Sequence, residues 1–202
     1  MSAPTRVVST VGPVLIIGSG LLGASLGLAL RAGGVRVYLE DASPTSLRLA
    51  SDVGAGVAFG DAIDEAGVAY ADAGTDAPGY EAPRIVVVAT PPDVADRVIV
   101  DSLLRFPGAI VTDVASVKDA VVADVLATLE ERGLEDAACR YVGSHPMAGR
   151  ERSGAGAADA DLFYGRPWVI VAHETTWPRA LLAARALATD VGAVPLEMNA
   201  GT

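Results

Sequence analysis

The chain has 202 residues, of which 51% are hydrophobic, and it carries a formal net charge of −10 at pH 7. A chain of this length can bury the core of one large α/β domain, and its negative charge disfavours nucleic acid or an anionic membrane as a partner. No apolar run approaches the roughly 20 residues of a membrane span, and the N-terminus lacks the pattern of a secretory signal. We therefore expect a cytoplasmic protein.

The cysteine, histidine and lysine content limits the chemistry further. Cys139 is the only cysteine, which excludes an internal disulfide and a cluster of thiolate ligands. His145 and His173 are far apart in the sequence, so we expect no metal site. No motif surrounds His173, which we expect to be a surface loop residue. Lys118 is the only lysine among the 15 basic residues, which hints that it is chemically required, although chance alone could leave a single lysine.

The first predicted elements are a buried strand over residues 14–17 and a helix over residues 24–31. Between them stands a GxGxxG motif in the strand–turn–helix setting that binds dinucleotides. Gly18 makes the tight turn, Gly20 lets a pyrophosphate approach the backbone, and Gly23 lets the helix pack closely on the strand. The helix N-terminus would face the phosphates with free N–H groups. The expected cofactor contacts of this motif are Gly18, Ser19, Gly20, Leu21, Leu22 and Gly23.

An acidic residue follows the next predicted strand, over residues 35–39. Glu40 and Asp41 both lie about 20 residues after the glycine turn, where a carboxylate binds the ribose hydroxyls. We favour Asp41, because it closes the strand just before a turn. Such a carboxylate repels a 2′-phosphate and favours NAD over NADP. Arg48, the nearest cation, is assigned to the solvent face of a helix that begins near Thr45.

Strands and helices continue to alternate along the chain. This pattern predicts one dinucleotide-binding domain over residues 1–202, an α/β fold with a doubly wound, mostly parallel Rossmann-type sheet and helices on both faces. Residues 54–82 are expected to be peripheral, with a short strand and helix. The further strands are expected over residues 84–89, 109–114, 141–143, 168–172 and 193–197, and the further helices from residue 93, over 119–131 and over 178–191.

Residues that follow the strand over 84–89 are also expected to contact the cofactor. Prolines just past a parallel strand turn the backbone over the sheet edge, and the cofactor of a doubly wound sheet lies at that edge. Ala89, Thr90 and Pro91 are therefore predicted cofactor contacts, although a plain strand-to-helix turn explains them equally well.

His145 is the candidate general base. Pro146 restricts the residue before it to extended geometry, so His145 is aimed in a defined direction from a strand terminus at Gly143. Histidine exchanges protons near neutral pH, although a loop histidine that caps a turn fits the same pattern. Ser116 follows the strand over 109–114 and can be a helix N-cap. In the usual strand order it would emerge beside His145 at the cofactor edge.

These residues carry a resemblance to a known family. The glycine motif is followed by DVASVK at residues 113–118 and by HPMAG at residues 145–149. Glu151-Arg152-Ser153-Gly154, Leu162-Phe163 and Trp168-Val169-Ile170 fit as well. Together they resemble the prephenate and arogenate dehydrogenases of tyrosine biosynthesis over nearly the whole chain, in order.

The resemblance implies that prephenate is oxidised and decarboxylated with NAD⁺ to 4-hydroxyphenylpyruvate. His145 would accept the proton of the ring hydroxyl, and Ser116 would be its partner near the substrate and the nicotinamide. Arg150 would bind a substrate carboxylate, although an exposed ion pair explains it equally well. Family members continue into a helical domain that forms a homodimer. This chain stops at Thr202, so we expect a fragment of a longer, dimeric protein, although a natural remnant fits the same observation.

Three alternatives to prephenate oxidation stay open at this point. Arogenate differs from prephenate only at a side chain remote from the reacting carbon. Another NAD-dependent reductase, of the β-hydroxyacid type, would use Lys118 in its chemistry. A non-catalytic NAD-binding module would need the glycine turn and Asp41 but neither His145 nor Ser116.

Overall fold

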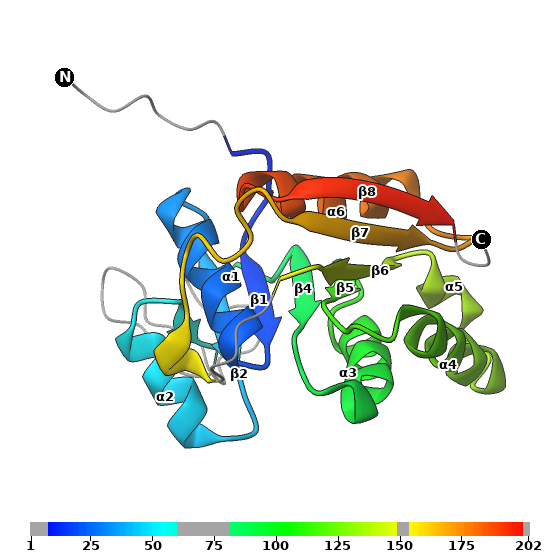
Figure 1. The fold of residues 1–202 in the computed structure, drawn as a ribbon. Helices are drawn as coiled ribbons and strands as arrows, with labels where there is room; N and C mark the ends of the chain where they lie inside the picture. The colour runs from blue at the N-terminus through cyan, green and yellow to red at the C-terminus, as the bar shows by residue number, and fades with distance from the viewer. Residues whose placement is uncertain (1–7, 60–80, 149–153, 200–202) are drawn as a thin grey trace.

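The computed structural model describes residues 8–59, 81–148 and 154–199, which form an eight-stranded sheet in the order β3-β2-β1-β4-β5-β6-β7-β8 (Figure 1). The strands are β1 (Val14–Ile17), β2 (Val37–Glu40), β3 (Val57–Ala58), β4 (Ile85–Val88), β5 (Ile110–Asp113), β6 (Tyr141–Pro146), β7 (Pro167–Ala172) and β8 (Val194–Asn199). The helices are α1 (Leu21–Ala32), α2 (Pro44–Asp52), α3 (Pro92–Arg105), α4 (Lys118–Glu131), α5 (Glu135–Ala138), the 3₁₀ turn η1 (Ala155–Ala157) and α6 (Pro178–Asp190).

The strand order reverses at β1, because β2 and β3 lie on one side of it and β4 to β8 lie on the other. The four residues of β1 are apolar and buried, as expected for a parallel strand with both faces covered. It pairs in parallel with β2 on one side and with β4 on the other, with Val14 opposite both Val37 and Ile85. Ligands of doubly wound sheets bind at the carboxyl ends of the strands at such a reversal. The predicted fold class is confirmed.

Helices cover both faces of the sheet. Because side chains alternate along a strand, β1 contributes to two separate cores. Val14 and Ile16 belong to the core shared with α1, α2 and α6, whereas Leu15 and Ile17 belong to the core shared with α3, α4 and α5. The sheet is therefore the middle layer of three, as the alternation of strands and helices predicts.

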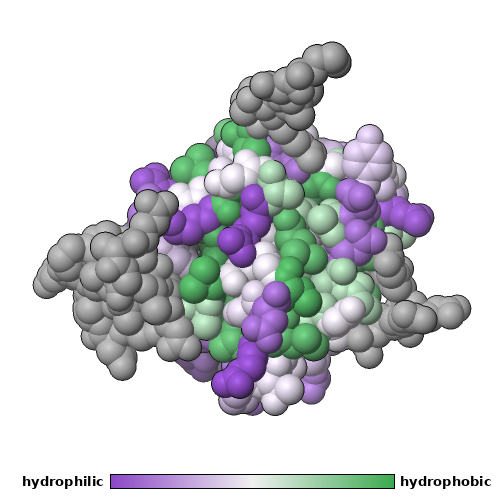
Figure 2. Space-filling model, turned by 90° about the vertical axis from the view of Figure 1, so that its left-hand side faces the viewer, coloured by the Kyte–Doolittle hydropathy of each residue, from purple (hydrophilic) through white to green (hydrophobic). Residues whose placement is uncertain are grey.

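The outer surface at one end of the molecule is mixed in character. The side on the left of Figure 1, where α1 and α2 lie, faces the viewer in Figure 2, and apolar and polar side chains are interspersed over its described surface. Leu49 of α2 and Val53 just after it are among the exposed apolar residues. Singly scattered apolar residues are normal for a protein surface and indicate no binding face by themselves.

β6 changes its pairing partner halfway along its length. Up to Val142 it pairs in parallel with β5, and beyond that residue it pairs antiparallel with β7, where His145 lies opposite Val169. The prediction that the strand ends at Gly143 is therefore wrong, because β7 supplies a partner that extends β6 to Pro146. His145 is held within a strand and not in a turn.

The packing of Gly27 generates a test of the fold. A Cβ atom at Gly27 of α1 would lie 2.2 Å from the backbone oxygen of Ala55, so Gly27→Ala forces α1 away from the loop after α2. We expect a loss of about 1–3 kcal/mol in the free energy of unfolding, measured by urea denaturation. Gly108→Ala is the matched control, because a Cβ there meets no atom within 4 Å. Equal losses in the two variants would contradict this contact.

Candidate functional site

A cavity of about 950 Å³ opens where the strand order reverses. Its walls come from the turn after β1, the end of β2, the turn after β4 and one side of α3. Ser19, Gly23 and Ser116, which are predicted cofactor contacts, are not among its lining residues. The predicted cofactor residues that do line it are Gly18, Gly20, Leu21, Leu22, Asp41, Ala89, Thr90 and Pro91.

Glycine is required at two of the three motif positions of the turn for steric reasons, and the third position differs from them. Gly18 has a φ of +103°, and a Cβ there would lie 2.5 Å from the backbone oxygen of Ala89. A Cβ at Gly23 would lie 1.9 Å from the backbone oxygen of Gly18. The fold itself therefore requires both glycines. A Cβ at Gly20 meets nothing within 4 Å, so the space beside this residue is open to a ligand.

The N-terminus of α1 is suited to an anion. Gly20 is its N-cap, no side chain bonds to the first N–H groups, and the first turn contains no acidic residue. The first N–H groups of a helix have no partner within the helix, and the helix dipole attracts negative charge to them. The position and the free donors fit the predicted binding of phosphate groups.

Asp41 braces the glycine turn from the end of β2. Its Oδ2 accepts hydrogen bonds from the backbone N–H of Ser19 at 2.6 Å and from the Ser19 hydroxyl at 2.7 Å. Its Oδ1 accepts the backbone N–H of Ser43 at 2.8 Å. The structure thus brings Ser19 and Asp41 together, and Ser19 belongs to the site through Asp41 and not through the cavity wall.

Thr90 presents an unused polar group at the cavity. Its Oγ1 is buried and has no hydrogen-bond partner within the described part of the chain. Because buried hydroxyls are almost always hydrogen-bonded, this atom fits a contact with a bound polar ligand. Together with the open space at Gly20, it makes the cavity fit a dinucleotide on grounds of its own geometry.

The two predicted catalytic residues lie on neighbouring elements. Ser116 stands in the loop between β5 and α4 and is exposed, while His145 is partly buried in β6. Nδ1 of His145 is buried without a hydrogen-bond partner among the residues described, so the Ser116 hydroxyl is not bonded to it. The strand adjacency that was predicted from the usual order is confirmed, since β5 pairs with β6.

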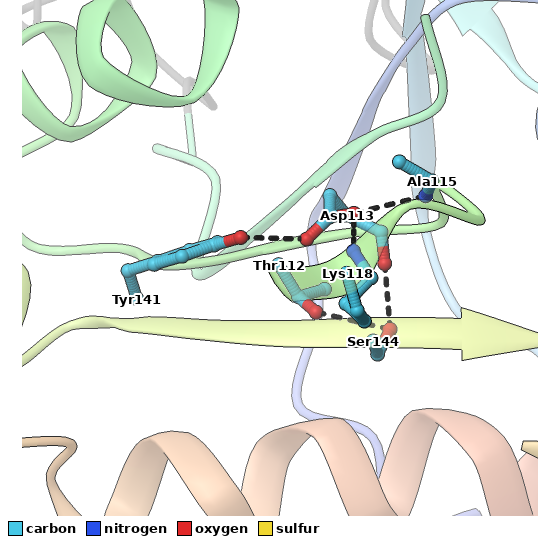
Figure 3. A network of polar contacts seen from close by, with 6 residues as sticks. All are labelled: Thr112, Asp113, Ala115, Lys118, Tyr141 and Ser144. Carbon is cyan, nitrogen blue, oxygen red and sulfur yellow. Dashed lines mark hydrogen bonds and ion pairs between the residues drawn. The ribbon is translucent and has the colours of Figure 1, made fainter. Parts of the chain in front are cut away.

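A buried polar network connects these two elements (Figure 3). The Asp113 carboxylate, at the end of β5, is fully buried and forms an ion pair with Lys118 at the start of α4. Its Oδ1 also accepts the backbone N–H of Ala115 at 2.9 Å, and its Oδ2 accepts the Tyr141 hydroxyl of β6 at 2.8 Å. The loop that carries Ser116 is therefore closed by one carboxylate.

The same network continues to the residue before His145. The Ser144 hydroxyl donates to the backbone oxygen of Asp113 at 2.6 Å and accepts from the Thr112 hydroxyl at 3.2 Å. These bonds join β6 to β5 beyond Val142, where the parallel backbone pairing stops. They hold the β6 segment that carries His145 close to the end of β5.

Gly143 is explained by the same lysine. A Cβ at Gly143 would lie 3.1 Å from Cδ of Lys118 and 3.0 Å from Cγ2 of Val122. The aliphatic part of the Lys118 side chain thus lies over β6 where any larger residue would crowd it. The structure gives the single lysine a structural role in this network. The sequence patterns did not reveal that role.

Burial sets the protonation of the network. Burial lowers the pKa of Lys118 from its ordinary value, and the charge of Asp113 counters part of that shift. Burial also raises the pKa of Tyr141 well above its usual value, and the Asp113 charge adds to the rise. Tyr141 therefore stays protonated, and its hydroxyl donates a hydrogen bond to the Asp113 carboxylate.

His173 differs from the expected surface loop residue. Its ring is half-buried and stacks on Tyr141 with 6.2 Å between the ring centroids, and Nε2 lies 3.2 Å from the backbone oxygen of Tyr141. Burial lowers the pKa of His173. The contact depends on the approach of β7 to β6, and no motif around His173 indicates it. Trp168 of β7 is a fully buried core residue.

Some expectations meet the limits of the described residues. Arg150, the predicted carboxylate-binding residue, lies outside them. Within residues 8–59, 81–148 and 154–199, no group of three or more His, Cys, Asp or Glu could hold a metal ion. Over the same ranges, the helices are too short or too polar to cross a membrane.

Comparisons with known proteins point to one family. The model of the prephenate dehydrogenase nucleotide-binding domain matches residues 26–197. The chain is 38% identical over 186 residues to the probable prephenate dehydrogenase NovF of Streptomyces niveus, with 92% of this chain and 45% of that protein covered. It is 27% identical over 192 residues to the prephenate dehydrogenase of Bacillus subtilis, with 92% and 46% covered. It therefore spans less than half the length of these two relatives.

A solved structure agrees with these matches. The prephenate dehydrogenase of Aquifex aeolicus, in complex with hydroxyphenyl propionate and NAD⁺, superposes with a TM-score of 0.71 at 25% identity. The match covers 92% of this chain and 59% of that one. The similarity thus extends over the sheet and both of its helical layers.

The ion pair of Lys118 generates a prediction about stability. Lys118→Met leaves the buried Asp113 carboxylate without a compensating charge, so we expect a loss of about 3–5 kcal/mol in the free energy of unfolding, measured by urea denaturation. Arg185→Met is the control, because its pair with Glu197 is exposed and should contribute below about 1 kcal/mol. A loss at Lys118 as small as that at Arg185 would show that the network is not structural.

Proposed function

Because the chain belongs to the prephenate dehydrogenase family, we propose that it forms the NAD-binding and histidine-bearing part of an enzyme that converts prephenate to 4-hydroxyphenylpyruvate. The observation that carries the proposal is the unpartnered imidazole nitrogen of His145 on β6, which lies three strands along the sheet from β1, the strand at which the cofactor cavity opens. A buried nitrogen without a partner is a group that a substrate can satisfy.

The cofactor would be held mainly by backbone groups. The N-terminus of α1 and the open space at Gly20 would take the pyrophosphate, Asp41 would take the ribose hydroxyls, and Thr90 would meet the cofactor with its free hydroxyl. Bound NAD⁺ would supply the acceptor for the hydride that leaves the substrate carbon.

His145 would act as the base of the reaction. It would accept the proton of the ring hydroxyl as hydride leaves the ring carbon that bears this hydroxyl. Loss of the ring carboxylate as CO₂ would then make the ring aromatic. Ser116 would hydrogen-bond the substrate hydroxyl or the imidazole once substrate is bound, and Arg150 would bind a substrate carboxylate. The network around Asp113 supports these roles, because it holds both the Ser116 loop and the β6 segment of His145.

The alternative functions differ in how many of these proposed residue roles they share. Arogenate would use the same His145 chemistry, since it differs from prephenate away from the reacting carbon. A reductase that uses Lys118 in its chemistry is disfavoured by the burial of that side chain and its ion pair with Asp113. We also propose that the protein is cytoplasmic and that the longer protein is a homodimer. Its activity would depend on segments beyond residue 202.

The cofactor assignment is tested by binding. Gly20→Val would fill the open space beside the turn, so we expect at least a tenfold loss of NAD⁺ affinity, measured by isothermal titration calorimetry of this chain. Gly20→Ala, measured alongside, should keep the melting temperature near that of the wild type, because a Cβ at Gly20 meets no protein atom within 4 Å. Unchanged affinity in Gly20→Val would remove the glycine turn from the proposed site.

The catalytic assignment is tested by turnover. His145→Ala should lower NADH formation from NAD⁺ and prephenate by about 10²–10⁴, the usual effect of a positioned base, while NAD⁺ affinity is retained. A parallel loss of NAD⁺ binding would instead give His145 a structural role. If the wild-type chain binds NAD⁺ without turnover, the wild type and His145→Ala are compared in the longer protein.

A further inference from the structure

The cofactor cavity contains an ion pair that the proposed binding of NAD does not use. Nη1 of Arg105, the last residue of α3, lies 2.9 Å from Oε1 and 2.8 Å from Oε2 of Glu40, the last residue of β2. Both residues line the cavity, next to Asp41. The pair therefore joins two walls of the cavity at the end of β2, where the adenosine ribose of a dinucleotide lies in doubly wound folds.

Two aromatic rings hold the Arg105 guanidinium in addition to Glu40. Its central carbon lies 5.2 Å from the ring centroid of Phe59 and 4.9 Å from that of Phe106. Contacts of this kind attract a cation to the ring face. The contacts with the two rings remain when Glu40 is substituted. Such a substitution therefore removes the charge partner of the guanidinium but leaves its position largely unchanged.

The charges around the cavity are unequal. Among its described lining residues, Glu40, Asp41 and Asp101 carry carboxylates and Arg105 is the single cation. A 2′-phosphate carries up to two negative charges and needs a cation, for which a guanidinium is the best-suited side chain. The Glu40 carboxylate balances the charge of Arg105, so the described cavity walls carry no cation without a paired carboxylate.

Asp41 and Glu40 consequently have separate tasks. Asp41 accepts hydrogen bonds from Ser19 and Ser43 and holds the turn in shape. Glu40 makes no such contact with the turn through its side chain in the described structure, and its carboxylate is directed to Arg105. The two neighbouring acids can therefore be separated by mutation.

We propose that the Glu40–Arg105 pair sets the choice between NAD and NADP in this chain, because Glu40 neutralises the guanidinium that would otherwise bind a 2′-phosphate. The inference rests on the proposed binding of a dinucleotide in this cavity. It assigns the rejection of NADP to Glu40, in addition to the repulsion expected from Asp41.

The test compares the affinities of two dinucleotides for the 202-residue chain by isothermal titration calorimetry. Glu40→Gln keeps the shape of the side chain and removes its charge. We expect the ratio of NADP⁺ affinity to NAD⁺ affinity to rise at least tenfold over the wild type. An unchanged ratio in a folded Glu40→Gln variant would overturn the proposal.

A second substitution shows whether Arg105 is the group released. In the Arg105→Met background, Glu40→Gln should leave the ratio of the two affinities unchanged, and a gain that persists without Arg105 would overturn the proposal. Glu197→Gln is the matched control, because it removes the carboxylate of another exposed arginine pair, one outside the cavity. A wild-type chain that binds neither dinucleotide would instead overturn the proposed function, and this inference with it.

Discussion

The Asp113 carboxylate is the group on which the candidate catalytic side of the molecule depends. It is fully buried, it is paired with Lys118, and it accepts the backbone N–H of Ala115 and the hydroxyl of Tyr141. Its backbone oxygen accepts the Ser144 hydroxyl. A buried charge is tolerated only when it is paired and fully hydrogen-bonded, so the end of β5, the start of α4 and β6 must come together for this site to exist.

The cofactor side of the site is built in a different way. There the shape depends on backbone that approaches closely at Gly18 and Gly23 and on free N–H groups at the start of α1. Asp41 adds a side chain that stabilises the turn through hydrogen bonds to Ser19. One half of the site is therefore preformed by main-chain geometry and the other by a buried polar network, and both face the carboxyl edge of the same parallel strands.

Predictions from the sequence succeed where the deciding interactions are local. The apolar strand, the glycine turn and the helix that follows lie within twenty consecutive residues, and the structure has all three where they are expected. The loop from Asp113 to Lys118 is equally local in sequence. Its role in the buried network became clear only from the hydrogen bond that the Tyr141 hydroxyl, on another strand, donates to Asp113. The end of β6 was placed too early, because residue preferences do not reveal that β7 returns antiparallel to it.

The sequence by itself determined the doubly wound class and the place of the glycine turn, and it supplied the candidate residues for the proposed chemistry. Those features follow from hydrophobic period and from the backbone freedom of glycine, which act over a few neighbouring residues. Only the tertiary structure decided that Lys118 is an internal counter-ion, that His173 stacks on Tyr141, and that Glu40 pairs with Arg105, 65 residues away. Each of these contacts joins elements whose approach depends on the packing of the whole sheet.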